Sequence, residues 1–325
     1  MTAGRVRVSL GRVASQLLRL VVVLLIVSIG TFGLVELIPG DPAQNFLGET
    51  STPEEYVRIR GELGLDRPVV TRYVDWLGSV LTGDFGKTLS QPVQPVSDVI
   101  TAALPVSLQL AAMAMAIALL ISIPAAMLSA QRPGSRLDRV IGVVTFSAVS
   151  IPSFLAAFLL ILFFVRTWSF FPRVTWVRLS ADPLDNLHHA FLPALSMAIV
   201  EIAVFTRLLR SDLISSLQES YVLAARARGM GKWEIMFKEV LRPSSFSLVT
   251  LAGVSLGRLI GSAVIVETIF GLPGLGRAIV GGAGQRNYTL VQGGVLVLAF
   301  IYVLVNAAVD VGYTRLDPRL RRRAT

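Results

Sequence analysis

Six long apolar runs, separated by polar and charged segments, dominate the pattern of this chain. About 20 consecutive apolar residues cross a bilayer as a helix. Lipid offers the backbone no hydrogen bonds, and the runs lack the period-two alternation of a membrane β-barrel, so helices are expected. We therefore predict an all-α membrane protein with six transmembrane helices. The predicted spans lie within residues 20–35, 98–132, 139–166, 186–206, 243–266 and 287–309.

Basic residues concentrate on one side of these spans. Six crossings place both chain ends on the same side, together with the loops at 131–139 and 207–242. That side carries 19 Lys and Arg residues against 6 Asp and Glu, whereas the opposite side carries 10 against 13. Because Lys and Arg favour cytoplasmic loops, we expect both termini in the cytoplasm.

The composition agrees with a membrane protein. Of the 325 residues, 53% are hydrophobic and 16% are charged, whereas a soluble domain carries about 25% charged residues. The net charge of +9 is spread between apolar runs rather than over one exposed face, so we expect no nucleic-acid partner. The absence of cysteine excludes disulfides, thiolate metal sites and a cysteine nucleophile. The first run follows four arginines, as in a signal peptide, but it is long and lacks a small-residue cleavage site, so we expect a retained anchor.

The segment at 40–97 is too polar to cross the membrane and too short for a large domain. Acidic residues after a proline, followed by spaced apolar positions, predict a small, mostly helical extracytoplasmic segment. Gly86, Lys87 and Thr88 resemble the end of a phosphate-binding loop, but Leu81 stands where that motif needs its first glycine. We predict an exposed turn there and no nucleotide site.

The loop at 207–242 carries two predicted short helices. Residues 219–228 interleave small apolar residues with two arginines, and Gly229 can end this helix because glycine tolerates a positive φ. A second helix is predicted at 232–241. An amphipathic hairpin on lipid head groups is one interpretation, and a projection that fills a groove of a partner protein is the other. The apolar side chains available for such a groove are Trp233, Ile235, Met236 and Phe237.

The order of residues in this loop resembles the EAA loop of bacterial ABC-importer permeases, which docks into a cleft of a separate ATPase subunit. Ala224, Ala225 and Gly229 stand at the spacing of that motif, whereas Leu223 replaces its acid and Pro243 falls one place late. The resemblance implies that the loop passes ATPase movement to the membrane helices. It assigns this coupling role to Tyr221, Ala224, Ala225, Arg228, Gly229, Lys232, Trp233 and Glu234.

A second ordered set of motifs resembles the B-type permease subunit of dipeptide, oligopeptide and nickel importers. The likeness covers nearly the whole chain, and Asn287 stands where the family usually has Asp. The motifs are IPGDP at 38–42, LGLD at 63–66, VETIFGLPGLG at 266–276, RNY at 286–288 and LDPR at 316–319.

This resemblance implies the type I ABC-importer permease fold and half of an alternating-access pathway for peptides. Nickel or a glutathione-like compound is the alternative cargo. The chain would be non-catalytic and hold no cofactor, with ATP and Mg bound to partners. Those partners would be a second, similar permease subunit in a heterodimer, two ATPase subunits or one fused ATPase, and an external substrate-binding protein. The resemblance also implies that the chain resides in the bacterial cytoplasmic (inner) membrane.

The expected division of the chain follows from the spans and the resemblance together. We expect four parts in order along the chain. They are the cytoplasmic N-terminus with the first transmembrane helix at 1–39, the extracytoplasmic segment at 40–97, a five-helix core with the coupling loop 207–242 at 98–313, and a basic cytoplasmic tail at 314–325.

Ionisable residues within membrane spans usually face a helix bundle or a water-filled cavity. Glu201 and Arg258 lie at similar depths on neighbouring spans. A structural ion pair is our first expectation, and a place in the pathway is the alternative. Asp310 follows Asn306 by one helical turn, on the same face, and we expect structural polar contacts from both.

Pro273 and Gly274 follow an apolar strand of β-branched residues and predict a tight, re-entrant turn. Irregular backbone near a membrane is tolerated where protein buries it or where it lines a cavity. The turn either caps two helices or forms an outer gate, for which Glu267 and Phe270 are the neighbouring candidates.

Two other function classes remain as alternatives. A stand-alone ion-coupled secondary transporter often shows matching repeats, and an intramembrane enzyme needs a nucleophile with a base or a metal motif. We find no convincing repeat and no such motif. His188 and His189 diverge by about 100° on a helix and make a poor chelate, so we expect no metal site.

Overall fold

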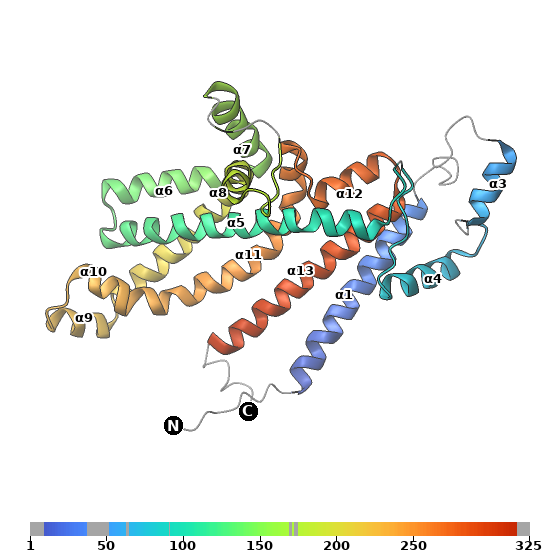
Figure 1. The fold of residues 1–325 in the computed structure, drawn as a ribbon. Coiled ribbons are helices and arrows are strands. Elements are labelled where there is room, and N and C mark those ends of the chain that lie inside the picture. The colour runs from blue at the N-terminus through green and yellow to red at the C-terminus, as the bar shows by residue number, and fades with distance from the viewer. Residues whose placement is uncertain are drawn as a thin grey trace. The chain divides into compact units, whose positions relative to one another are not determined.

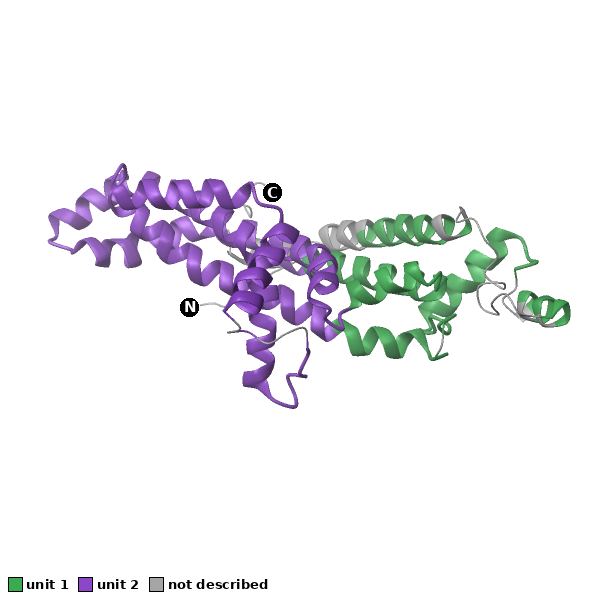
Figure 2. Cartoon of the chain, turned by 90° about the horizontal axis from the view of Figure 1, so that it is seen from above, with its two compact units in different colours: residues 1–104, 275–307 green, residues 105–274, 308–325 purple. Residues whose placement is uncertain are grey.

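The computed structural model describes residues 10–37, 52–62, 65–90, 92–168, 171 and 175–316. The IPGDP motif at 38–42 and the basic tail from 317 onward lie outside these residues. The chain forms two compact units, residues 1–104 with 275–307 and residues 105–274 with 308–325 (Figure 2). Within the described residues the secondary structure is helical, apart from one isolated bridge between Lys87 and Pro95.

The first unit contains an aromatic cluster that joins its N-terminal helices. Phe32 is buried, and its ring centroid lies 5.5 Å from that of Tyr73 and 5.7 Å from that of Trp76. Two helices form in the segment predicted to be mostly helical. The helices of this unit are α1 (Leu10–Leu37), α3 (Pro53–Glu62), α4 (Val69–Leu81), the start of α5 (Val96–Gln131), α12 (Leu275–Gly284) and most of α13 (Tyr288–Leu316) (Figure 1).

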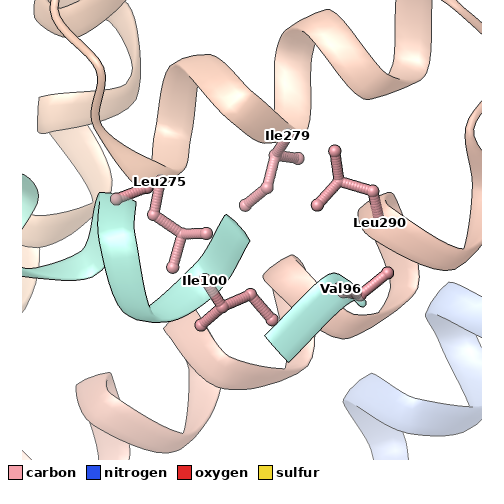
Figure 3. Close-up of a cluster of buried hydrophobic side chains, with 6 residues drawn as sticks. Val96, Ile100, Leu275, Ile279 and Leu290 are labelled. Atoms are coloured by element: carbon pink, nitrogen blue, oxygen red, sulfur yellow. The ribbon is translucent and has the colours of Figure 1, made fainter. Parts of the chain in front are cut away.

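The core of the first unit lies where the start of α5 meets α12 and α13. Side chains from all three helices point toward one another and are almost fully removed from solvent. Branched aliphatic side chains dominate this contact, so its stability comes from apolar burial. The cluster consists of Val96, Ile100, Ala103, Leu275, Ile279 and Leu290 (Figure 3).

Helix α8 (Pro183–Leu217) is the central helix of the second unit. The helices α6 (Arg136–Val149), α7 (Ser153–Leu160) and α11 (Leu241–Phe270) all pack against it. Its apolar side chains Phe205, Leu209 and Leu213 are fully buried in these contacts. The remaining elements are the π-helix η1 (Ile161–Thr167), α9 (Ser220–Ala227), α10 (Lys232–Ile235) and the π-helix η2 (Met236–Val240) (Figure 1).

Four described helices are long and apolar enough to cross a membrane. A bent pair of helices raises that number to five, and α1 contributes a shorter apolar stretch, Leu20–Gly33. The protein is therefore an all-helical membrane protein with four to five candidate spans among the described residues, and the sixth crossing stays a prediction. The four are Val96–Gln131, Pro183–Leu217, Lys232–Phe270 and Tyr288–Val309.

The third predicted span is not one straight helix. The chain bends by 107° between Arg136–Val149 and Ser153–Thr167. Pro152 explains the break, because proline has no N–H to donate and disfavours helical geometry at the residue before it. The sequence contains this proline, but it does not give the angle.

The predicted loop at 207–242 is shorter than expected. Helix α8 continues to Leu217, and the chain is helical again from Lys232 to Phe270, without a break at Pro243. The π-helix η2 ends at Val240, three residues before that proline. Extra residues in a π turn displace the carbonyl with which a proline ring would clash, so the helix can continue through it.

Candidate functional site

Residues 218–240, which we call the elbow, join α8 to α11 at one end of both helices (Figure 1). Gly229 forms the bend with φ +81°, a conformation that is strained for other residues. Its N–H donates to the Arg226 carbonyl at 2.9 Å, and the Met230 N–H donates to the Ala225 carbonyl at 3.3 Å. These bonds end α9, so α10 starts in a new direction.

The inner side of the elbow is a small apolar core. Val222 and Ala225 of α9 are fully buried. On the following helix, Ile235, Met236 and Val240 are each at most 3% exposed. The prediction that Ile235 and Met236 are available to a partner is therefore wrong. Side chains on this face instead fill the space where α10 meets α9 and where η2 meets α8, which makes the elbow rigid.

The outer side of the elbow carries an exposed aromatic pair. The rings of Trp233 and Phe237 stack with centroids 5.9 Å apart, and both side chains are about half exposed. Polar residues surround this pair, and Lys238 Nζ lies 2.7 Å from Glu234 Oε1. Exposed aromatic side chains in a polar rim are typical of a protein-binding surface. The other exposed candidates are Tyr221, Ala224, Arg228, Gly229 and Lys232.

Glu201 and Arg258 lie together within the second unit. Arg258 Nη2 is 3.1 Å from Glu201 Oε2 and 2.7 Å from Ser255 Oγ. The Glu201 side chain is only 7% exposed, whereas that of Arg258 is 54% exposed. The pairing that their depths predict is thus present, but the cation of the pair faces outward.

The turn after α11 is packed. Glu267, Phe270 and Gly274 are buried, whereas Pro273 is exposed. A Cβ atom at Gly274 would lie 2.2 Å from Glu267 Cδ, so only glycine lets the chain pass over this carboxyl group. The residues before the turn form a helix rather than the expected strand, because α11 runs to Phe270. This geometry agrees with a turn that caps helices and gives no support to a gate at Glu267 or Phe270.

A buried ionic cluster, which the sequence did not reveal, joins α5, α6 and α8. Arg210 donates to both carboxylate oxygens of Asp138, from Nε at 2.7 Å and from Nη2 at 2.8 Å. Ser129 donates to the same carboxylate, as does the Gly134 N–H at 2.8 Å. A lone acid in a loop with three arginines predicts some ion pair, but the partner on a distant helix has no local signal.

The turn predicted at Gly86, Lys87 and Thr88 is exposed only in part, because Gly86 and Lys87 are exposed whereas Thr88 is not. Thr88 is buried, and this segment is bonded to the start of α13. The Leu89 N–H donates to Asn287 Oδ1 at 3.1 Å, while Asn287 Nδ2 donates to Ser90 Oγ at 3.0 Å. Asn287, singled out as a departure from the family pattern, thus holds the two segments together.

The structure describes the side chain of Asn306 in α13 but not that of its predicted partner Asp310. Asn306 is half-buried in the helix. Asp310 belongs to the same helix, and its side chain lies outside the described part of the chain. Their structural role stays a prediction.

Comparison with known proteins agrees with this arrangement. Residues 122–322 match the binding-protein-dependent transport system inner membrane component, and residues 10–111 match its N-terminal component. A putative peptide transport system permease protein of Brucella abortus (strain 2308) is 37% identical over 92% of this chain and 95% of its own length. The oligopeptide transport system permease protein AppB of Bacillus subtilis (strain 168) is 33% identical over 92% and 95%.

Further relatives give the same result. The dipeptide transport system permease protein DppB of Alkalihalophilus pseudofirmus is 30% identical over 94% of this chain and 98% of its own length. A chain of the MetNI methionine ABC transporter, solved in inward-facing conformations, matches the fold with a TM-score of 0.53 at 19% identity, over 70% of this chain and 99% of that chain. This chain belongs to the family of binding-protein-dependent transport system inner-membrane components, the non-catalytic permease subunits of ABC transporters.

Proposed function

We propose that this chain is the permease subunit of an ATP-driven importer of peptides. The cargo class rests on one observation. Relatives that are 30–37% identical to this chain over more than nine-tenths of its length are peptide, oligopeptide or dipeptide permeases by name. Nickel or a glutathione-like compound is the alternative cargo, since sequence motifs recur across cargoes. Family membership implies ATPase and binding-protein partners.

The elbow transmits movement from the ATPase in this proposal. Its exposed aromatic pair, Trp233 and Phe237, docks into the ATPase, and its buried core keeps the two short helices together. Because α8 and the helix from Lys232 to Phe270 leave the elbow directly, displacement of the elbow tilts both helices as rigid rods. ATP-driven closure of the ATPases then opens the pathway outward, and hydrolysis returns it inward.

The exposed face of α11 supports a place in the pathway. Large apolar side chains alone form the exposed surface of α7 and the first part of η1, as expected for contact with lipid. The exposed positions of α11 differ, because charged, hydroxyl-bearing and small residues recur among them at helical spacing. The hydroxyl groups of Thr250 and Thr268 donate to backbone carbonyls one turn earlier, so Arg258 is the residue on this face whose charge lipid does not solvate and that requires water or protein. The positions are Thr250, Val254, Arg258, Gly261, Ile265 and Thr268.

The rest of the assembly follows from the same proposal. A second, similar permease subunit completes the pathway as a heterodimer, and two ATPase subunits or one fused ATPase bind the elbows. Six spans place both termini in the cytoplasm and the segment at 40–97 outside. The core at 98–313 then has the type I importer fold, and the tail from 314 onward anchors at the inner membrane surface.

Reconstitution tests the proposed function. The complete set of subunits is placed in proteoliposomes with the binding protein, and uptake of labelled short peptides is measured with and without ATP. We expect uptake that requires ATP and every subunit. Uptake driven by a proton gradient through this chain alone would contradict the proposal. ATP-driven uptake of nickel but not of peptides would show that nickel, rather than a peptide, is the cargo.

Cysteine accessibility tests the pathway face, and the cysteine-free chain makes a direct experiment possible. Val254 on α11 is 50% exposed and Leu155 on α7 is 42% exposed, so each is changed to Cys in the assembled importer. A membrane-impermeant methanethiosulfonate reagent reacts with thiolates, which form in water but not in lipid. We expect Val254→Cys to be modified at least about tenfold faster than Leu155→Cys.

Two results would contradict the proposal that this face of α11 lines the pathway. Equal rates, or no reaction at Val254→Cys in any nucleotide state, would mean that lipid or a permanent protein contact covers this face of α11. Mass spectrometry of the modified chain gives both rates in one sample.

A further inference from the structure

Arg258 uses one corner of its guanidinium group for all its hydrogen bonds within the described residues. Nη2 donates to Glu201 Oε1 at 3.2 Å, to Glu201 Oε2 at 3.1 Å and to Ser255 Oγ at 2.7 Å. A guanidinium group carries five N–H donors in a planar fork. No group in the described part of the chain bonds to Nε or Nη1, so one edge of the fork is open.

The open edge lies on the exposed side of the helix. The Arg258 side chain is 54% exposed, whereas its partner Glu201 is 7% exposed. Toward the C-terminal end of α11, one turn away, a Cβ atom added to Gly261 would meet nothing within 4 Å. The guanidinium group reaches back toward Ser255, on the other side of Arg258 from Gly261, so the 54% exposure of the side chain is what leaves this edge accessible.

An open cationic edge in the middle of a membrane helix needs a polar partner. A charge that faced lipid would be costly, so such residues face water, protein or a ligand. Glu201 balances the charge of Arg258 but occupies only one corner of it. The fork geometry that remains matches the two oxygens of a carboxylate better than it matches a single acceptor.

We propose that the open edge of Arg258 binds the terminal carboxylate of the peptide during its passage. This inference rests on the proposed function, because it assigns a contact to the cargo of that importer. Every linear peptide with a free C-terminus carries this group, so the contact does not depend on the peptide sequence. Glu201 fixes the arginine and lowers the net charge of the pair to zero, which keeps the carboxylate from binding too tightly to be released.

The test compares short alanine peptides with a free C-terminus and the same peptides with a C-terminal amide. Alanine peptides have no side-chain carboxylate, so only the terminal group differs. The complete importer in proteoliposomes receives both forms from saturated binding protein, and the ratio of their ATP-dependent initial rates is measured. Because each permease variant uses the same binding protein, a change in this ratio is caused by the permease.

The double variant E201Q/R258Q removes both charges and leaves two amides that can bond to each other. We expect the ratio of free acid to amide to fall by about tenfold, the factor of one charge-assisted hydrogen bond. R258K keeps the ion pair with Glu201 but lacks the second edge of the fork, and its ratio falls by at least about threefold. R207Q, an exposed arginine on α8 whose guanidinium lies 6.0 Å from the Phe146 ring, is the matched control and leaves the ratio unchanged.

The outcomes separate the two proposals. An unchanged ratio in an assembled double variant or in R258K overturns the carboxylate contact, while uptake by the wild type still supports peptide import. Equal rates for both peptide forms in the wild type also overturn the contact. A wild-type importer that takes up neither form contradicts the proposed function and the contact with it.

Discussion

Replacing Trp233 and Phe237 together by alanine is expected to abolish ATP-driven uptake, although the permease still inserts into the membrane. The two rings form the exposed apolar surface of α10 and η2, and they stack on each other rather than on the core of the elbow. Removing them therefore leaves the buried side chains in place. Truncation of a central aromatic contact typically costs at least about 2 kcal/mol of binding free energy, which is about thirtyfold in affinity.

The measurement has two parts. Affinity of the purified permease pair for the ATPase subunits is determined in detergent, and uptake is determined after reconstitution. The control is the change of Phe164 and Trp168 to alanine, because these rings also form an aromatic pair, edge to face with centroids 5.4 Å apart, at the predicted extracytoplasmic end of the third span. We expect the control to bind the ATPase as the wild type does.

The same experiment separates docking from membrane anchoring. If the elbow lies on lipid head groups, loss of the two rings leaves ATPase affinity unchanged and uptake nearly intact. If affinity falls but uptake persists, a different surface transmits the movement. Only a joint loss of affinity and uptake agrees with the proposed coupling.

The sequence predicted the elbow more accurately than its two surfaces. Gly229 marks the bend because a positive φ has a local chemical signature, and the helices on either side follow from apolar spacing. Which apolar residues face inward could not be assigned, since Trp233, Ile235, Met236 and Phe237 are adjacent or nearly so. Tertiary contacts of α10 with α9 and of η2 with α8 decide that Ile235 and Met236 are buried.

Long-range polar contacts were predictable only where membrane depth restricts them. Glu201 and Arg258 are isolated charges in neighbouring apolar spans, so few partners exist at their depth. Asp138 and Arg210 lie near span ends, where several arginines compete for one acid, and no local pattern selects the pair. The bend before α7 could likewise not be predicted in full, because Pro152 predicts a break in the helix but packing sets the 107° angle.

The cluster of Asp138, Arg210 and Ser129 makes the base of α8 rigid just before the elbow. Arg210 lies two turns before the end of α8, and its bonds join that helix to the end of α5 and the first turn of α6. In the proposed coupling, movement of the elbow would therefore reach α6 as well as α8.

Arg210→Gln is expected to destabilise the protein more than Asp138→Asn. The Asp138 side chain is 8% exposed and that of Arg210 is 33% exposed, so loss of the arginine leaves a buried carboxylate without its countercharge, whereas loss of the acid leaves a cation that can reach water. Removing one partner of a buried pair costs about 3 kcal/mol or more. We expect about that cost for Arg210→Gln and about 1–2 kcal/mol for Asp138→Asn, because the remaining cation is partly hydrated.

Unfolding in detergent micelles tests this order, with Arg207→Gln as the control on the same helix. The double variant Asp138→Asn with Arg210→Gln should cost less than the sum of the single changes, by about 1 kcal/mol or more, because it leaves no uncompensated charge. Additive costs, or a cost for Arg210→Gln no larger than that for Arg207→Gln, would show that the ion pair contributes nothing to the fold. In that case the cluster could not carry movement from the elbow to α6, and the proposed coupling would reach the membrane helices through α8 and α11 alone.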